Sequence, residues 1–197
     1  MDSQITLVNS ASESVDLVFE KPSISSLHNT VYLNSRPLYT ITTRARDGAQ
    51  TKVFDVSTTH LAITIDRSVF FSDKITFADR NDGKAIKVND WMKETKIPKQ
   101  HPIHVMETPY GKFTWKVDVV HRHALYSEAD PENPIAYMKP ATSSSPMALH
   151  LESGTESFRE EILGSFLLVE QRMRMKEKES TIGYGVAMEA SRPFSLG

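Results

Sequence analysis

Hydrophobic and polar residues alternate along most of the first 150 residues, and a period of two is the pattern of strands with one buried face. Residues 60–66, HLAITID, and residues 112–118, KFTWKVD, show it most clearly, because every second residue in each is apolar. The same alternation, often weaker, runs through VDLVFE, MALHL, QITLV, TVYLN, LYTITT, TKVFDV, KITFA, KAIKV, IHVME, HALYS and PIAYMK. Roughly a dozen strands at such short spacing predict a sandwich or a barrel.

The period changes after Ser153, where residues 157–179 predict a helix. Its segment 162–169, ILGSFLLV, is apolar on nearly every side, which is typical of a helix that is buried all round. These residues span only about 12 Å, far less than the hydrocarbon core of a bilayer, which argues against a membrane anchor. Gly164 lowers helix stability by about 1 kcal/mol relative to alanine, so its presence predicts tight packing against neighbouring backbone.

We therefore predict a mainly β fold, a roughly 12-stranded antiparallel barrel closed around one buried C-terminal hydrophobic helix. The single barrel domain is expected at residues 15–179, between an N-terminal arm of residues 1–14 and a flexible C-terminal tail of residues 180–197. Residues 88–102 do not alternate, and they predict a short helical turn followed by a loop.

Composition excludes several function classes. Apolar residues make up 39% and charged residues 24% of the chain, as in ordinary soluble proteins. The net charge of -2 gives no overall attraction to nucleic acid, so none is expected as a partner. The absence of cysteine removes disulfides, thiol nucleophiles and zinc–thiolate sites. The first residues lack the basic start and apolar block of a signal peptide, so we expect a cytoplasmic protein, with a peripheral membrane or nuclear location left open.

Four segments carry a resemblance to a known family: NTVYLNSRPLYTITT, GKFTWKVD, ALYSEADPENPIAYMKP and ILGSFLLVEQRMRMKEKE. They resemble a family of fungal, largely basidiomycete, proteins of unassigned function, over about residues 15–179. The matching features are a tyrosine-containing strand pair, a Gly-x-aromatic-x-Trp-Lys strand and a charged run at the end of the late helix. They fall on Tyr32, Tyr39, Gly111, Phe113, Trp115, Lys116, Val169, Glu170 and Arg174.

The expected layout is also similar to the tubby C-terminal domain, the LURP-one-related proteins and the phospholipid scramblases. In tubby-like proteins a basic surface binds phosphoinositide headgroups, so this likeness implies a lipid-binding role. No motif places the binding residues of those proteins on this chain, and fold alone does not imply function.

Seven histidines raise the hypothesis of a metal or catalytic site. His101 and His104 are three residues apart, and His121 and His123 would share one face of a strand, with His150 as a further candidate. Two such imidazoles can share a metal ion, but no acidic residue stands at ligand spacing beside them. We therefore predict no metal, no cofactor and no catalytic residue, and keep a histidine-based hydrolase as an alternative.

The lysines point to a function with a known physical mechanism, the electrostatic attraction of anionic groups. Residues 84–116 contain seven lysines against three acidic residues. Among them, Lys87, Lys112 and Lys116 are predicted to point outward, and clustered ammonium groups attract anionic headgroups by about 1 kcal/mol each. Lysines also guard exposed strand edges, so an ordinary solvated face is the competing interpretation.

No motif of a nucleophile elbow or a phosphate-binding loop occurs. The sequence therefore favours a non-enzymatic binding module that recognises anionic phospholipid headgroups through a basic face. A module for protein–protein interaction, such as a homo-oligomer or scaffold, and the histidine-based hydrolase are the alternatives.

Overall fold

The computed structural model of the chain describes residues 13–22, 28–44, 50–68, 71–96, 101–118 and 120–190, with residues 178–190 described for their backbone alone. The predicted strand QITLV and residues 1–12 of the predicted arm lie outside these ranges. The described strands are β1 (Val15–Phe19), β2 (His28–Leu33), β3 (Arg36–Arg44), β4 (Gln50–Asp55), β5 (Leu61–Asp66), β6 (Lys74–Phe77), β7 (Ile86–Lys87), β8 (Met92–Thr95), β9 (Ile103–Thr108), β10 (Gly111–Lys116), β11 (Ala124–Ser127), β12 (Pro134–Lys139) and β13 (Ala148–Leu151). The helices are two short 3-10 turns, η1 (Asn81–Gly83) and η2 (Glu156–Phe158), the four-residue α1 (Val88–Trp91) and the long α2 (Arg159–Ala190).

All thirteen described strands belong to one antiparallel sheet, in the order β7-β6-β5-β4-β3-β2-β1-β13-β12-β11-β10-β9-β8. Most neighbours are consecutive in the chain, as hairpins require. The turn between β2 and β3 consists of Asn34 and Ser35, which both have positive φ angles, the geometry of a tight two-residue hairpin. The first described strand pairs with the last, Val15 opposite Leu151, so β1 and β13 meet in the middle of the sheet and not at its edges.

The mainly β prediction is confirmed, and the strand count of thirteen is close to the predicted dozen. Residues 92–95 form β8, although the sequence predicted a loop there after the helical turn that is α1. Only Met92 of this strand is fully buried, because β8 lies at an edge of the sheet, so its alternation is weak. The other edge is β7, and within the described residues β7 and β8 do not pair as neighbouring strands.

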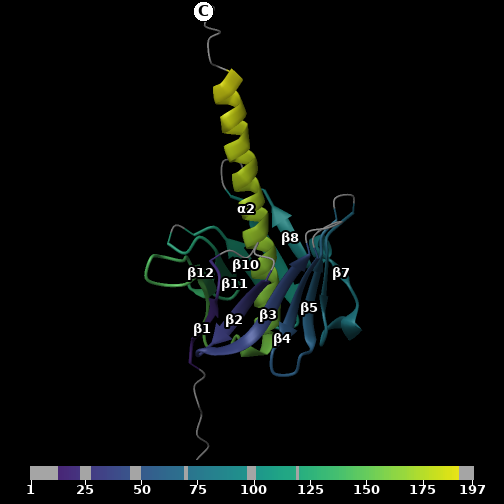
Figure 1. Cartoon of the computed structure of the whole chain (residues 1–197). Coiled ribbons are helices and arrows are strands. Elements are labelled where there is room, and N and C mark those ends of the chain that lie inside the picture. The colour runs from purple at the N-terminus through teal and green to yellow at the C-terminus, as the bar shows by residue number, and fades with distance from the viewer. Residues whose placement is uncertain are drawn as a thin grey trace, which may run out of the picture.

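The sheet curves around the first part of α2, and the helix then projects beyond it (Figure 1). Strands from distant places in the sheet contact the same helical segment. The ring of Phe166 lies 5.8 Å from that of Phe19 on β1 and 6.1 Å from that of Trp115 on β10. Phe166 is fully buried and Leu168 is 1% exposed, which confirms that the apolar segment is internal.

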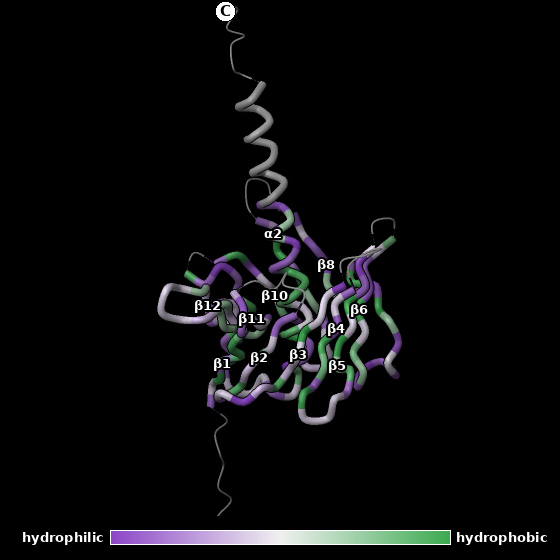
Figure 2. The backbone as a smooth tube through the Cα atoms, viewed as in Figure 1, coloured by the Kyte–Doolittle hydropathy of each residue, from purple (hydrophilic) through white to green (hydrophobic). Residues whose placement is uncertain are grey.

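In the described residues, hydropathy follows this arrangement. Hydrophobic and hydrophilic positions alternate along the strands, and a hydrophilic stretch marks the point where α2 leaves the sheet (Figure 2). Two polar side chains in the core bond to each other. Trp115 Nε1 donates a hydrogen bond to Ser165 Oγ at 2.9 Å, and the Ser165 hydroxyl donates one to the carbonyl of Ile162. Because both groups are buried, leaving either without a partner would cost about 1–3 kcal/mol.

Gly164 lets α2 approach the sheet closely, but through side chains and not through backbone as predicted. A Cβ atom at this position would lie 3.1 Å from Ile75 Cδ1 and 3.2 Å from Phe77 Cε1. Both residues belong to β6, whose inward side chains fill the space that a larger residue on the helix would need.

The two ends of α2 differ from the prediction. A 3-10 turn occupies residues 156–158, so the α-helix begins at Arg159 and not at 157. The helix then continues to Ala190 and includes residues 180–190 of the segment predicted as a flexible tail. Gly183 and Gly185 weaken the helical signal of that segment in the sequence, whereas the turns of α2 that precede it supply the helical nucleus.

A buried ion cluster fixes α2 where it leaves the sheet. Glu170 is fully buried, and its carboxylate accepts hydrogen bonds from Arg122 Nε at 2.9 Å and from Arg174 Nε. His123 Nε2 lies 3.0 Å from the same carboxylate, and Arg174 also donates to the carbonyl of Pro22. Burial alone would raise the pKa of Glu170, but contacts with His123, Arg122 and Arg174 outweigh it and lower the pKa to about 2.

The opposite end of α2 is held by a second, smaller cluster. Arg80 donates to the carboxylate of Glu161 at 2.9 Å, to the carbonyl of Ser157 and to the hydroxyl of Tyr110. The ring of Tyr110 stacks on Phe158, with ring centroids 5.2 Å apart. The start of the helix is therefore tied to the turns that follow β6 and β9.

Replacing Gly164 by leucine should destabilise the fold by about 1–3 kcal/mol or more, because the new side chain must displace Ile75 and Phe77. Chemical denaturation measures the change in the free energy of unfolding. Gln171→Leu, at a half-buried position of the same helix, is the control and should change stability much less. Equal stability of the two variants would show that the contact with β6 is loose.

Glu170→Gln should lower stability at neutral pH by about 3–5 kcal/mol, because it leaves Arg122 and Arg174 without their buried carboxylate. The folded-state pKa of Glu170 lies below its ordinary value of 4.5, so its stabilising contribution is present above that value and disappears as pH falls towards about 2. Unfolding curves measured between pH values of about 7 and 2 should therefore converge for the wild type and the variant.

Glu177→Gln is the matched control, since Glu177 pairs with the same Arg122 but is 49% exposed. It should cost less than about 1 kcal/mol. A parallel offset between the wild type and Glu170→Gln at every pH would contradict the ionised state of Glu170.

Candidate functional site

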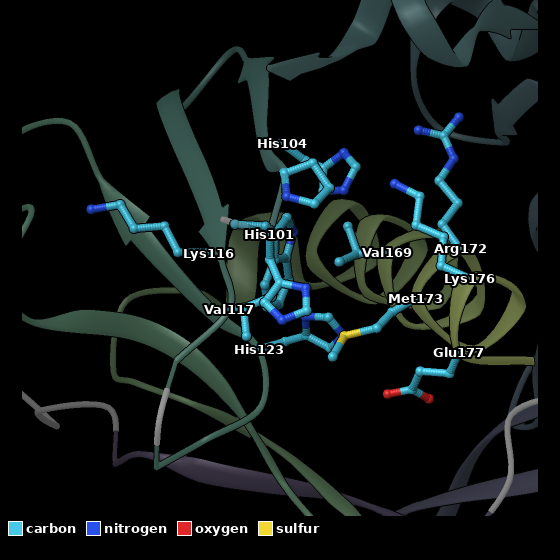
Figure 3. A pocket seen from close by; sticks show the side chains of 12 residues that line it. His101, His104, Lys116, Val117, His123, Val169, Arg172, Met173, Lys176 and Glu177 are labelled. Carbon is cyan, nitrogen blue, oxygen red and sulfur yellow. The ribbon is translucent and has the colours of Figure 1, made fainter. Parts of the chain in front are cut away.

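A pocket of about 170 Å³ opens where α2 leaves the sheet, and we call it the exit pocket. One wall comes from the strands and their loops, and the other comes from α2 (Figure 3). The lining residues are His101, Pro102, His104, Trp115, Lys116, Val117, His123, Val169, Arg172, Met173, Lys176 and Glu177. Its volume is below the roughly 300–1,000 Å³ of drug-sized sites, so it suits a small molecule or part of a larger one.

The helical wall follows directly from helix periodicity. Val169, Arg172, Met173 and Lys176 stand at spacings of three and four residues, which places them on one face of α2. Val169 is buried, Arg172 and Met173 are half-buried, and Lys176 is exposed. The pocket therefore has an apolar inner part and a cationic mouth on the helix side.

Two histidines form the inner polar part of the pocket. His104 is 4% and His123 is 1% exposed, and the Nδ1 atom of each is buried without a hydrogen-bond partner. Burial lowers the pKa of His104 to about 4, and the carboxylate of Glu94 offsets only part of that effect. His104 is therefore uncharged at neutral pH and offers one donor and one acceptor nitrogen.

The contact between His123 and Glu170 decides which nitrogen of His123 carries hydrogen. Nε2 lies 3.0 Å from a carboxylate oxygen of Glu170, although the contact is not aligned as a hydrogen bond. Two lone pairs at that distance would repel each other, so a neutral His123 carries its hydrogen on Nε2. Its unpartnered Nδ1 is then an acceptor that is closed to solvent.

The cationic groups at the mouth of the pocket already have partners. Arg172 lies 3.5 Å from Asp73 and 3.8 Å from Glu94, and Lys176 lies 3.3 Å from Glu94. Lys116 Nζ sits 4.6 Å from the centre of the Tyr126 ring. The mouth is thus moderately cationic, with much of its charge balanced by acidic neighbours.

The structure separates the three lysines of the predicted basic face. Lys112 and Lys116 stand at opposite ends of β10, about 13 Å apart along the strand. Lys112 pairs with Glu128 at 3.0 Å, whereas Lys116 borders the exit pocket. Lys87 is exposed on the edge strand β7, opposite Lys74 in the register.

Of the four histidines in the two predicted pairs, His101, His104 and His123 line one pocket, whereas His121 does not. His121 packs against Tyr137, with ring centroids 4.0 Å apart and the rings tilted by 32°, whereas His123 lies against Glu170. Both lie in the loop before β11, where Arg122 has a φ of 55° and reverses the chain between them. Across the described residues, no group of three histidine or acidic side chains is arranged to hold a metal ion.

Sequence reasoning missed the helical wall of the exit pocket. The sequence predicted no pocket at this wall, although the spacing of Met173 and Lys176 from Val169 continues the buried face of α2. That spacing was the available signal, but it does not reveal which strand loops stand opposite.

A second hollow of about 220 Å³ lies at the start of α2 and is polar. It is lined by Tyr39, Asp79, Arg80, Glu156, Ser157, Arg159, Glu160 and Glu161. Burial and the neighbouring acids Asp79 and Glu161 raise the pKa of Glu160. Arg80 there is bonded to Glu161, but the lining has four acidic side chains against two arginines, so the hollow carries an excess of acidic groups.

Comparisons with known proteins give one result. The model of a family of unknown function, DUF6593, matches residues 25–175, whereas neither a curated protein nor a solved structure matches the chain. None of the described helices combines the length and the apolar composition that crossing a membrane requires. The family match covers most of the chain, including the described strands from β2 onward and the buried part of α2, so the protein belongs to the family of unknown function DUF6593.

Proposed function

We propose that the protein is a non-enzymatic binding module that docks on anionic phospholipid membranes through the end of the sheet where α2 leaves it, the exit end. The observation that carries this proposal is the position of the exposed apolar side chains. Phe71 is 80% and Val120 is 74% exposed, and both are in loops of the exit end. Apolar side chains that project from the same end of the molecule are suited to enter the headgroup layer of one membrane.

Ion pairs to α2 place both loops at the exit end. Asp73, two residues after Phe71, lies 3.5 Å from Arg172 on the helix. Arg122, two residues after Val120, binds Glu177. The one exposed large apolar residue described at the other end is Tyr110, which is 44% exposed and stacks on Phe158.

Lysines surround these apolar loops. Lys74 and Lys87 face each other across β6 and β7 beside the loop of Phe71, and Lys116 stands at the end of β10 beside the loop of Val120. Each lysine near an anionic membrane contributes about 1 kcal/mol of attraction. Apolar tips that enter the headgroup layer and cations that meet lipid phosphates act together in peripheral membrane binding.

The projecting part of α2 is compatible with this orientation. Residues 180–190 contain one charged residue, Glu189, and at about 1.5 Å per residue they span about 16 Å. That length is about half the hydrocarbon thickness of a bilayer, so the helix end fits within one leaflet.

The same proposal includes a closed, tubby-like barrel. Its support is that α1 connects the two edge strands and that Trp91 of α1 packs on Phe77 of β6, with ring centroids 5.3 Å apart. The barrel would then close through side-chain packing between α1 and β6, and not through hydrogen bonds between the edge strands β7 and β8. The likeness to tubby-like domains, whose basic surface binds phosphoinositides, adds weight to a lipid ligand.

The alternatives have less support. The exit pocket has histidines, but the described residues of its lining include no serine, threonine or cysteine to act as a nucleophile, which disfavours a hydrolase. A protein partner would also cover Phe71 and Val120, and it is the alternative that the membrane experiment tests.

Replacing Lys87 and Lys116 together by glutamate should weaken binding to vesicles that contain phosphatidylserine by about tenfold or more. Co-sedimentation at low and high salt measures the effect. Lys112→Glu is the matched control, because Lys112 is on the same strand but at the opposite end, and it should bind almost as wild type. An equal loss in the control would contradict the exit end as the docking face.

Phe71→Ser combined with Val120→Ser should weaken vesicle binding, with Tyr110→Ser as the control for an apolar residue at the other end. Binding to neutral vesicles should be weak for every variant. If the wild type does not sediment with anionic vesicles at low salt, the membrane proposal is wrong and the exposed loops are better explained by a protein partner.

A further inference from the structure

We propose that the exit pocket binds a short straight-chain carboxylate, with about six carbons of its chain inside the pocket and its carboxylate group at the mouth. This inference goes beyond membrane docking, because the ligand is a free small molecule and not a lipid of the bilayer. Lipid chains fill a leaflet about 15 Å thick, so they are too long for this pocket.

The volume of the pocket sets the length of the chain. A cavity of about 150 Å³ lined by apolar side chains binds benzene, and so has room for about six carbons. The exit pocket has a volume of about 170 Å³. It therefore holds an aliphatic chain of similar size, and the carbons of a longer chain would lie outside.

The surface that the pocket offers to a ligand is mainly apolar. Pro102, Val117 and Met173 are half-buried, so each keeps accessible surface, and the buried Trp115 and Val169 complete the apolar lining. Met173 extends from α2 towards the wall formed by the strands and loops (Figure 3). Because a methionine side chain is unbranched and flexible, it adapts to the irregular outline of an aliphatic chain.

The histidines of the lining do not offer their Nδ1 atoms to a ligand. In both His104 and His123 this atom is closed to solvent. A polar group that entered the inner part of the pocket would lose its water without gaining a hydrogen bond from either nitrogen. The inner part therefore favours methylene and methyl groups.

The inner part is also unsuited to a negative charge. The buried carboxylate of Glu170 lies 3.0 Å from Nε2 of His123, which belongs to the lining. The pKa of Glu170 is lowered to about 2, so this carboxylate is ionised at neutral pH. Like charges repel strongly in a buried environment, so the ligand enters with its methyl end first.

Cations at the mouth favour a negative group there. Among the described residues of the lining, the cations Lys116, Arg172 and Lys176 stand against one carboxylate, that of Glu177. The acidic neighbours of Arg172 and Lys176 lie 3.3 to 3.8 Å away, which is longer than a typical N–H···O hydrogen bond. Since arginine and lysine each carry several N–H donors, both side chains have donors left for a ligand carboxylate.

Titration of the full chain with butanoate, hexanoate and octanoate tests the chain length. The methyl groups of isotope-labelled methionines are followed by NMR, because Met173 lines the pocket, whereas Met175 is 54% exposed and lies outside the lining. Affinity should rise about fourfold for each methylene from butanoate to hexanoate and level off at octanoate. The signal of Met173 should shift, and that of Met175 should not.

Three results of this titration would overturn the proposal. They are equal affinity across the series, a rise that continues unchanged to octanoate, and a shift of the Met175 signal as large as that of Met173.

Hexanol and hexylammonium, which have the same chain, test the carboxylate group. Hexanoate should bind about threefold or more tightly than hexanol, and hexylammonium should bind most weakly. Lys176→Glu should remove the advantage of hexanoate over hexanol. Lys112→Glu, at the far end of β10, is the control and should retain it. Tighter binding of hexylammonium, or unchanged hexanoate binding in Lys176→Glu, would refute the cationic mouth.

Two substitutions of Met173 locate the chain in the pocket. Met173→Trp fills the pocket and should abolish hexanoate binding, whereas Met173→Ala enlarges it, so octanoate should then bind more tightly than hexanoate. Met175→Trp is the matched control and should bind hexanoate as the wild type does. Thermal unfolding checks that each variant is folded. Unchanged hexanoate binding in Met173→Trp would place the ligand elsewhere and refute the pocket.

Vesicle binding separates this inference from the proposed function. Met173→Trp should sediment with anionic vesicles as the wild type does, since Lys87, Lys116 and the exposed loops are unchanged. Loss of both hexanoate binding and vesicle binding in this variant would show that the pocket serves the lipid, and it would refute a separate small-molecule site.

Discussion

The burial of residues 162–170 inside a curved sheet is the constraint on which the rest of this structure depends. A sheet cannot bury its own apolar face, so the inner face of this curved sheet needs a second apolar surface to pack against. The first half of α2 supplies that surface on every side, and β1, β6 and β10 all contact it. Because the helix is enclosed, each of its polar groups needs a partner from a strand or loop.

The two ion clusters at the ends of the enclosed segment follow from that need. Glu161 meets Arg80 at the start, and Glu170 meets Arg122 and His123 where the helix leaves. A buried carboxylate is costly unless it is paired, so these contacts set the depth of α2 within the sheet. They also fix the loop between β10 and β11, which carries Val120 at its surface and His123 in its interior.

The exit pocket is a consequence of the same geometry. The strands end near residue 116 on β10, while α2 continues with Met173 and Lys176 on the face that Val169 had turned inward. Where the helix and the sheet separate, the surfaces that they turn towards each other are still partly apolar. The surrounding loops add histidine side chains to the inner part of the pocket and cations to its mouth, and the same end of the molecule carries the exposed side chains of Phe71 and Val120.

The sequence by itself determined the local elements and the core. Alternation at residues 112–118 and 60–66 identified inward-facing Trp115 and Ile63, and the apolar run around Phe166 identified an enclosed helix, because burial selects residue types position by position. Edge strand β8 gave a weak pattern, since only Met92 of its residues is fully buried, and the continuation of the helix to Ala190 was not predicted.

The tertiary structure alone decided which distant residues meet. Lys112 and Lys116 have similar sequence surroundings, yet one pairs with Glu128 and the other borders the exit pocket. His121 and His123 are two residues apart, yet one stacks on Tyr137 and the other lies buried against Glu170. Such pairings depend on strand order and on the depth of the helix, which are properties of the whole packed core and leave no period or motif in the chain.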